Sequence, residues 1–251
     1  MTNTLFDFWG KAERNGSGWH PTVCHMLDTG IMAREILSLQ PPTFRQRLTS
    51  HFDPDETKAL NVLAFVAALH DIGKISPGFQ LKRQDLCAPL KVRGFAFPPA
   101  SESKHGRIVL DALTEVLENR YCCGRYDADA LARILAAHHG VFEECRDVVG
   151  GGDRIWQDAR EETVAFLAKI FGVTSLASVR LENVPELFLL AGLISVADWI
   201  ASDEQTFGNL NSAPADSHSL YLWYLRGGYS GGGICSGGRV YPYRQAAIVC
   251  L

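Results

Sequence analysis

A His-Asp pair, a His-His pair and an isolated aspartate lie where their side chains could form one chemical site. His70 and Asp71 directly follow the most apolar segment of the chain, and His138 and His139 follow another apolar segment. Asp198 lies within a third apolar run, where an unpaired carboxylate would be strongly destabilising. Neutral imidazoles and carboxylates are the usual ligands of Mn, Fe, Co, Ni and Zn. A metal centre would account for all five residues at once.

Two further histidines extend this set. His25 lies in the first long predicted helix, with Asp28 three residues later, where the carboxylate can accept a hydrogen bond from the imidazole and orient it. His105 begins another predicted helix. A single histidine is more often a helix cap or a core residue, so the prediction depends on the whole set. Seven ligands are too many for one metal ion but suit two, with the two oxygens of one aspartate bridging them.

The segments that must position these side chains are predicted to be helices. Apolar spacing, prolines at helix starts and glycines at helix ends mark them, whereas strand-type alternation is absent before residue 220. The predicted helices are 21–40, 59–70, 105–119, 129–139, 158–172 and 186–201. Asp127 is a possible cap for the fourth, and Asp158 with Glu161 resembles a capping box for the fifth. The expectation is an all-α domain with a packed interior.

Two segments differ from these helices. The basic segment, residues 79–107, has a local charge of +4, contains Phe79, Phe95 and Phe97, and is predicted to be a loop as far as Ser101. Aromatic rings and cations of this kind suit a single nucleic-acid strand, although a solvated loop explains them as well. From Arg226 onward the glycine density predicts a linker or a frayed tail. We therefore expect a domain over residues 1–225 and a glycine-rich tail over 226–251.

Composition excludes several classes of protein. A net charge of −4 over 251 residues excludes a strongly basic nucleic-acid binder, and 47% hydrophobic residues exclude a disordered chain. The seven cysteines form no Cys-x-x-Cys pair, so neither a disulfide framework nor a zinc ribbon is indicated. The start of the chain lacks signal-peptide character, and the longest apolar stretch is too short for a membrane span. A cytoplasmic protein without membrane contact is expected.

The order and text of the motifs resemble a known family. His25, the pair His70-Asp71 and Asp198 resemble the signature of the HD phosphohydrolase superfamily. The surrounding motifs resemble the HD nuclease domain of the CRISPR-associated nuclease–helicase of type I CRISPR systems, over roughly residues 15 to 205. These motifs are His20–Gly30, His70–Gln80, Lys104–Gly106, His138–Gly140 and Val196–Asp203.

This resemblance implies an HD-domain helical bundle with a dimetal site. One divalent ion (Mn, Fe, Ni or Co) would be held by His25, His70, Asp71 and Asp198, and a second by Asp71, His105, His138 and His139. Asp71 would be the bridging, catalytic carboxylate. Lys74 would steady the scissile phosphate, although a surface lysine closing a helix is an equally good interpretation.

The resemblance also implies an activity and partners. The expected enzyme is a metal-dependent nuclease of antiviral defence that cleaves single-stranded DNA first endonucleolytically and then exonucleolytically. Its partners would be a helicase domain or subunit and the CRISPR RNA-guided surveillance complex. No Gly-x-x-x-x-Gly-Lys-Ser/Thr motif occurs, so the helicase part is expected to be separate or missing.

The alternative is an HD-superfamily phosphohydrolase that acts on nucleotides or cyclic dinucleotides. The cyclic-dinucleotide branch carries a Gly-Tyr-Pro signature, and the nearest sequence here is Val240-Tyr241-Pro242, which differs at its first position. A nucleotidase would need only four ligands and would leave His105, His138 and His139 without a role.

Overall fold

The computed structural model describes residues 4–12, 18–99, 104–141, 150–181 and 185–203, together with the backbone of 233–236 and 239–242. Most of these residues are helical, which confirms the predicted all-α fold class. The longer helices are α1 (Thr22–Ser38), α2 (Pro42–Thr49), α3 (Glu56–Ala68), α6 (His105–Tyr121), α7 (Arg125–Ala136), α8 (Arg154–Phe171) and α9 (Leu187–Ala201). The short elements before α6 are η1 (Thr4–Phe6), η2 (Leu69–Lys74), α4 (Pro77–Gln80), η3 (Leu81–Leu86) and α5 (Ala88–Val92).

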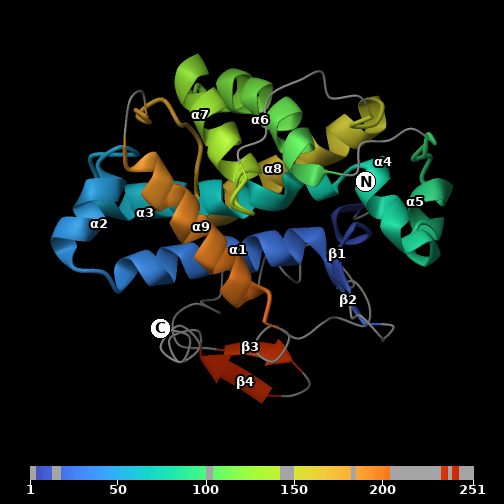
Figure 1. The fold of residues 1–251 in the computed structure, drawn as a ribbon, viewed down its shortest axis with the longest axis horizontal. Coiled ribbons are helices and arrows are strands. Elements are labelled where there is room, and N and C mark those ends of the chain that lie inside the picture. Colours follow the sequence, from blue (N-terminus) through green and yellow to red (C-terminus); the bar gives the residue numbers. More distant parts are fainter. Residues whose placement is uncertain are drawn as a thin grey trace.

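Helix α1 runs through the interior and is buried along nearly its whole length. It packs against α3 on one side and α9 on another, and Figure 1 shows α9 crossing it. Gly30 permits the close approach of α3, because a Cβ there would lie 2.6 Å from the carbonyl oxygen of Ala64. The first and last long helices of the described domain are therefore held against each other by direct packing.

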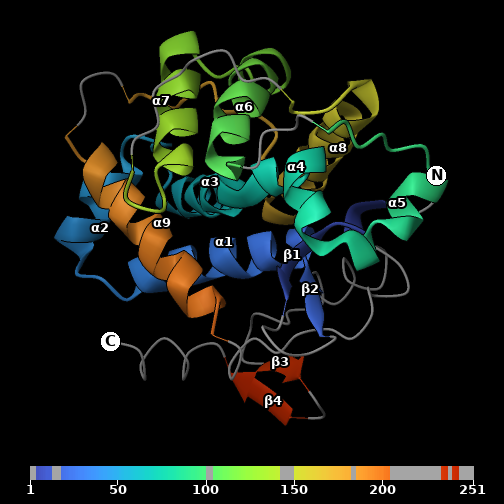
Figure 2. The same ribbon diagram turned by 45° about the vertical axis from the view of Figure 1, so that its right-hand side comes forward.

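Helices α6 and α7 form an antiparallel pair over the end of α3 (Figure 2). Helix α6 contacts η2, and α7 contacts both η2 and α9. Helix α8 packs against α3. All the elements that carry candidate ligands thus meet around η2, which directly continues the buried helix α3.

A small sheet before α1 corrects the expectation that no strand precedes residue 220. Strands β1 (Trp9–Ala12) and β2 (Trp19–Pro21) pair antiparallel, with Lys11 opposite His20. With four and three residues, the strands are too short to show a period-two pattern that could be recognised in the sequence.

Two predicted helix starts are wrong. Helix α8 begins at Arg154, so Asp158 lies inside the helix and pairs with Arg154 at 2.7 Å instead of capping it. Helix α7 begins at Arg125, and the Asp127 carboxylate accepts a hydrogen bond from the backbone N–H of Leu181 at 2.5 Å. In both cases the carboxylate that the sequence pattern predicted to cap the helix interacts with another group instead. The predicted end of α8 is correct, since Gly172 has a φ of 67°.

The basic segment is not the predicted loop over its first part. Elements α4, η3 and α5 occupy residues 77–92, and Phe79 and Phe95 are buried. Phe79 stacks on Trp9 with ring centroids 4.6 Å apart, and Phe95 packs edge-on against Trp156 at 4.8 Å. These rings therefore belong to the core and are not available to stack on bases, which corrects their predicted role.

Within the predicted tail, β3 (Gly233–Ser236) and β4 (Arg239–Pro242) pair antiparallel. Residues 204–232 lie outside the described part, so the boundary at residues 225 and 226 stays a prediction. Among the described helices none is by itself long and apolar enough for a membrane span. Two consecutive helical segments, Glu56–Lys74 and Pro77–Leu86, are long and apolar enough only when taken together, and the chain bends by 70° between them.

The contact at Gly30 predicts a stability difference between two glycine substitutions. Gly30→Ala should lower the free energy of unfolding by about 1–3 kcal/mol, because the new methyl group meets the α3 backbone. Gly192→Ala in α9 is the matched control, since nothing lies within 4 Å of its added Cβ. Alanine there should raise stability by about 0.5–1 kcal/mol. Urea unfolding of both variants measures this, and a Gly30→Ala variant as stable as wild type would contradict it.

Candidate metal centre

The His70–Asp71 pair lies in η2, where all six residues are buried. Apolar α3 ends at Ala68, and the tighter 3₁₀ turn that follows places both side chains in the interior. His70 Nδ1 donates a hydrogen bond to the carbonyl oxygen of Ala67 at 3.0 Å. In the neutral ring, which is the form that binds a metal ion, its Nε2 atom therefore carries the lone pair and faces the other candidate ligands, which is how histidine ligands are usually oriented.

Four of the predicted ligands form the four-ligand group: His25 from α1, His70 and Asp71 from η2, and Asp198 from α9. All are buried, and their ligating atoms lie within 4.8 Å of one another. His25 Nε2 lies 3.2 Å from Asp71 Oδ2, 2.9 Å from Asp198 Oδ1 and 3.3 Å from His70 Nε2. Segments up to 173 residues apart in sequence thus direct nitrogen and oxygen atoms at one point.

The remaining three ligands form the three-histidine group: His105 at the start of α6, and His138 and His139 after the end of α7. Their ligating atoms also lie within 4.8 Å of one another, with 3.1 Å between Nε2 of His105 and Nε2 of His139. His138 is buried, whereas His139 is exposed. His138 Nδ1 donates to the carbonyl oxygen of Leu135 at 2.6 Å, so its Nε2 is also directed inward.

Asp71 lies between the two groups. Its Oδ2 atom is 3.2 Å from both His25 Nε2 and His70 Nε2, and its Oδ1 atom is 3.3 Å from His105 Nε2 and 3.7 Å from His138 Nε2. Although they are buried, Asp71 Oδ1 and His138 Nε2 have no hydrogen-bond partner among the described residues. Buried lone pairs of this kind are costly unless something satisfies them, and a cation on each side of Asp71 would do so.

Burial keeps two of the imidazoles neutral. It lowers the pKa of His25 to about 4, with the nearby Lys11 ammonium acting in the same direction. It also lowers the pKa of His138 to about 3, where His70 adds to the effect. Both rings are therefore neutral at pH 7, which is the form that binds a metal ion.

The two aspartates remain ionised and favour positive charge around them. Burial alone would raise the pKa of Asp71, but Lys74 and His70 hold it well below its usual range. Hydrogen bonds from His25 and His70 likewise lower the pKa of Asp198 against the effect of its burial. Burial opposes the protonation of His70, yet Asp71 and Asp198 raise its pKa to about 9. The four-ligand group is thus an environment that stabilises a cation.

Lys74 is buried and contacts Asp71, with 2.5 Å between Nζ and Oδ2. This position does not match the interpretation of Lys74 as a surface lysine at the end of a helix. Its ammonium lies one turn beyond the His70–Asp71 pair, on the four-ligand side of the Asp71 carboxylate. The predicted contact with a phosphate stays a prediction.

Two glycines allow the ligand-bearing elements to approach each other. A Cβ on Gly73 would lie 2.0 Å from the carbonyl oxygen of His105, and one on Gly106 would lie 2.9 Å from that of Ala136. The first contact brings Asp71 next to His105, and the second brings His105 next to His139. Both glycines lie within the family motifs, but the sequence analysis predicted no separate role for either.

Asp28 does not orient His25, which corrects the prediction for that pair. The Asp28 carboxylate instead lies 3.0 Å from His20 Nε2, and His25 Nδ1 has no hydrogen-bond partner among the described residues. A spacing of three residues on a helix permits the contact, but His20 on β2 provides a competing partner. Because β2 was not predicted, that competition could not be seen in the sequence.

Several positioning residues were also missed. Ser195 on α9 donates to the carbonyl oxygen of His138 at 2.6 Å and so ties α9 to the three-histidine group. Gln80 is wholly buried, and its side-chain amide donates to the carbonyl oxygens of Lys74 and Trp9, at 2.9 Å each. Lys11 on β1 donates to Ala201 at the end of α9. Ordinary residue types outside any motif give no local signal for such roles.

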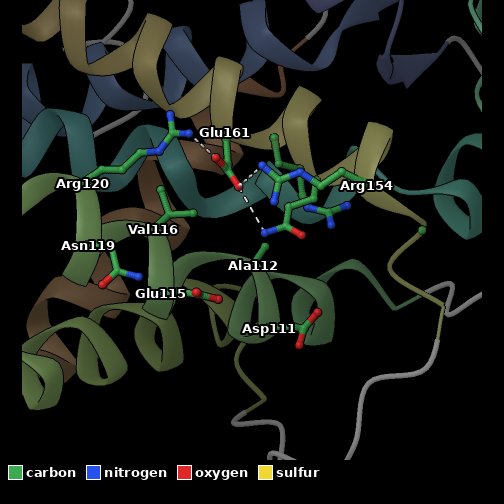
Figure 3. Close-up of a pocket in the computed structure, with 11 residues that line it drawn as sticks. Asp111, Ala112, Glu115, Val116, Asn119, Arg120, Arg154 and Glu161 are labelled. Carbon is green, nitrogen blue, oxygen red and sulfur yellow. Dashed lines mark hydrogen bonds and ion pairs between the residues drawn. The ribbon is translucent and has the colours of Figure 1, made fainter.

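A cavity of about 410 Å³ lies away from the histidines, between α6 and α8. Figure 3 shows Arg120 and Arg154 directed at Glu161 along its α8 wall, where their ion pairs are formed. Arg160 also lines it, and its guanidinium donates to the carbonyl oxygens of Ile75 and Gly151 at 2.9 and 2.7 Å. Since Ile75 directly follows η2, Arg160 connects the end of that turn to α8 and to the segment that precedes it.

The chain is similar to proteins of CRISPR systems. It is 31% identical over 208 residues to the CRISPR-associated endonuclease/helicase Cas3 of Thermus thermophilus. The alignment covers 79% of this chain and 22% of that protein. The three curated relatives it matches are all much longer, and the chain spans about a quarter of their length.

Solved structures support the same relationship. A crystal structure of a CRISPR-associated protein superposes with a TM-score of 0.82 at 29% identity, covering 98% of this chain and 27% of that one. The crystal structure of the Thermus thermophilus Cas3 HD domain in the presence of Ni²⁺ superposes with a TM-score of 0.62 at 26% identity. That match covers 95% of this chain and 98% of the other.

The model of the family described as "Cas3, HD domain" matches residues 9–207, a range that contains every candidate ligand described above. The resemblance seen in the motifs is therefore confirmed, and the chain belongs to the Cas3 HD domain family.

Proposed function

We propose that this chain is a metal-dependent nuclease that hydrolyses phosphodiester bonds of single-stranded DNA, nicking first and then degrading, in type I CRISPR interference. The observation that carries this proposal is the position of Asp71, whose two carboxylate oxygens face different ligand groups. Membership of the Cas3 HD family supports the nuclease class. The relative crystallised with Ni²⁺ supports a divalent metal.

The residues present fit two divalent transition-metal ions (Mn, Fe, Ni or Co), because every candidate donor is a nitrogen or a carboxylate oxygen. The four-ligand group would hold one ion and the three-histidine group the other, with Asp71 contributing an oxygen to each. Bound there, such ions would activate a water molecule and stabilise the leaving 3′ oxygen. No nucleophilic side chain is needed for this reaction.

The protein groups have separate tasks in this proposal. Lys74 neutralises Asp71 at rest, and its ammonium would turn to the scissile phosphate when substrate binds. His139 is exposed and His105 is partly exposed, whereas the ligands on the other side of Asp71 are buried. DNA would therefore approach from the side of His105 and His139.

Within the basic segment, Lys82 lies close to the three-histidine group. Its ammonium lies 4.6 Å from the centre of the Phe79 ring, which in turn packs edge-on against His105 at 5.6 Å. Arg83 and Arg93 form ion pairs with Asp85 and Asp7, at 2.6 and 2.7 Å. Because of this position, we expect Lys82 to be a cation that contacts the DNA backbone beside the metal centre.

A partner would supply the strand in this proposal. The net charge of −4 predicts weak binding of DNA by the chain alone. The Thermus thermophilus relative is named an endonuclease/helicase and is several times longer, which supports a helicase part acting together with this domain. The CRISPR RNA-guided surveillance complex would direct the pair to DNA, in the cytoplasm.

Asp71→Asn tests the metal centre. Removing the charge shared by both groups should abolish binding of both ions and lower Mn²⁺- or Ni²⁺-dependent cleavage of circular single-stranded DNA at least about 100-fold. Metal analysis of the wild type should find close to two ions per chain. The matched control is Asp127→Asn, a buried aspartate outside both groups whose amide oxygen can still accept from Leu181.

Three outcomes would contradict this proposal. Cleavage retained by Asp71→Asn would mean that the activity belongs to a contaminant. A wild type that binds no transition metal after reconstitution would remove the site. Hydrolysis of dNTPs or cyclic dinucleotides faster than DNA would favour the nucleotide phosphohydrolase.

Lys82→Ala tests the path of the DNA. Fluorescence anisotropy with a labelled single strand, in chelator to prevent cleavage, should show weaker binding than wild type. The slope of log affinity against log salt should fall by about 0.7, the value for one lost phosphate contact. Lys58→Ala removes the same charge from an exposed position at the start of α3 and should leave the slope unchanged. Equal effects of both substitutions would show that only overall charge matters.

A further inference from the structure

Strand β1 connects the two parts of the chain that supply carboxylates to the four-ligand group. On one side, Trp9 is held by Gln80, whose amide also binds the backbone at Lys74, three residues after Asp71. On the other side, Lys11 reaches Ala201 and Ser202 at the end of α9, three and four residues beyond Asp198. The strand therefore fixes η2 and α9 relative to each other.

The contact of Lys11 with α9 has a defined direction. Its ammonium donates to the carbonyl oxygen of Ala201 at 3.1 Å and to the hydroxyl of Ser202. An ammonium has no lone pair, so Ser202 Oγ must be the acceptor, and its own proton is left for another group. The available acceptors are on Asp198: its carbonyl oxygen at 2.5 Å and its carboxylate Oδ1 at 3.2 Å.

Asp198 Oδ1 is the same atom that lies 2.9 Å from His25 Nε2. Ser202 thus contacts the carboxylate directly, and Lys11 reaches it through Ser202, so that together they can fix its rotamer. Outer contacts of this kind orient metal ligands and strengthen their binding.

We propose that Lys11, acting through the hydroxyl of Ser202, is a positioning residue that holds the Asp198 carboxylate in its metal-binding orientation. This inference rests on the proposed function, since it assigns an outer contact to the same metal centre. Lys11 acts without touching the substrate, because its donors are directed at the end of α9.

A purely electrostatic role and a positioning role of Lys11 predict opposite changes in metal affinity when the residue is removed. A lysine beside the centre repels a divalent cation, so removing its charge alone would tighten metal binding. If Lys11 positions Asp198, its removal weakens metal binding instead. The sign of the change therefore separates the two roles.

The experiment measures Ni²⁺ affinity of the metal-stripped full chain by titration calorimetry, with thermal unfolding of the same samples without metal. Lys11→Met, which keeps most of the aliphatic stem, and Ser202→Ala should each weaken binding of the tighter ion about tenfold. Lys11→Arg, which keeps the charge and the donors, should bind within about threefold of wild type. Lys58→Met is the matched control and should bind as wild type does.

The double variant tests whether the two residues act in series. If Lys11 works through Ser202, combining Lys11→Met with Ser202→Ala should weaken binding no more than either substitution alone. Fully additive losses would overturn the series arrangement. Wild-type or tighter affinity in Lys11→Met, or wild-type affinity in Ser202→Ala, would overturn the proposal. If Lys11→Met loses its cooperative thermal transition, Ser202→Ala decides the question.

The failure of this inference differs from the failure of the proposed function. A wild type that binds Ni²⁺ and cleaves DNA, with a Lys11→Met variant of equal affinity, overturns the positioning role alone. A wild type that binds no Ni²⁺ overturns both.

Discussion

The burial of two ionised carboxylates is the constraint on which this structure depends. Asp71 is 1% exposed and Asp198 is 8% exposed, and each would be strongly destabilising without compensating partners. Those partners come from separate elements: His25 from α1, His70 and Lys74 from η2, and Lys11 from β1. The helices that carry them must therefore converge at one point, and the apolar faces of α1, α3 and α9 drive that convergence.

One local device orients ligands on both sides of Asp71. His70 and His138 each donate Nδ1–H to the carbonyl oxygen three residues earlier, at the end of a helix whose last carbonyls lack helical partners. The helix end thus selects the tautomer of each neutral imidazole, in which the lone pair of Nε2 faces the interior. Two glycines also contribute, because Gly73 lies against the backbone of His105 and Gly106 against that of Ala136. A side chain at either position would push the ligand-bearing elements apart.

The sequence predicts the helices and the ligand set well because both depend on strong, local signals. Long apolar runs followed by His-Asp or His-His are visible without knowing the fold, and the family motifs order them. The partner of Asp28 and the burial of Phe79 were mispredicted because each depends on a residue brought close by the tertiary fold, His20 in the first case and Trp9 in the second. Lys11 was missed for the same reason, since its contact with Ser202 crosses 191 positions of sequence. Membership of the family could be inferred from motifs, whereas the contacts that orient the ligands depend on the tertiary fold.

The long sequence separation between Lys11 and Ser202 has a consequence for synthesis of the protein. The contacts around Asp198 join the start of the described chain, at Lys11, to residues that leave the ribosome last within the matched domain. A nascent chain that already contains His25 and the His70–Asp71 pair still lacks the second carboxylate until α9 has emerged and docked on α1. A prematurely terminated product that stops before α9 would therefore carry six of the seven candidate ligands without the complete four-ligand group. The four-ligand group is therefore completed only when α9, the last long helix of the domain, has docked.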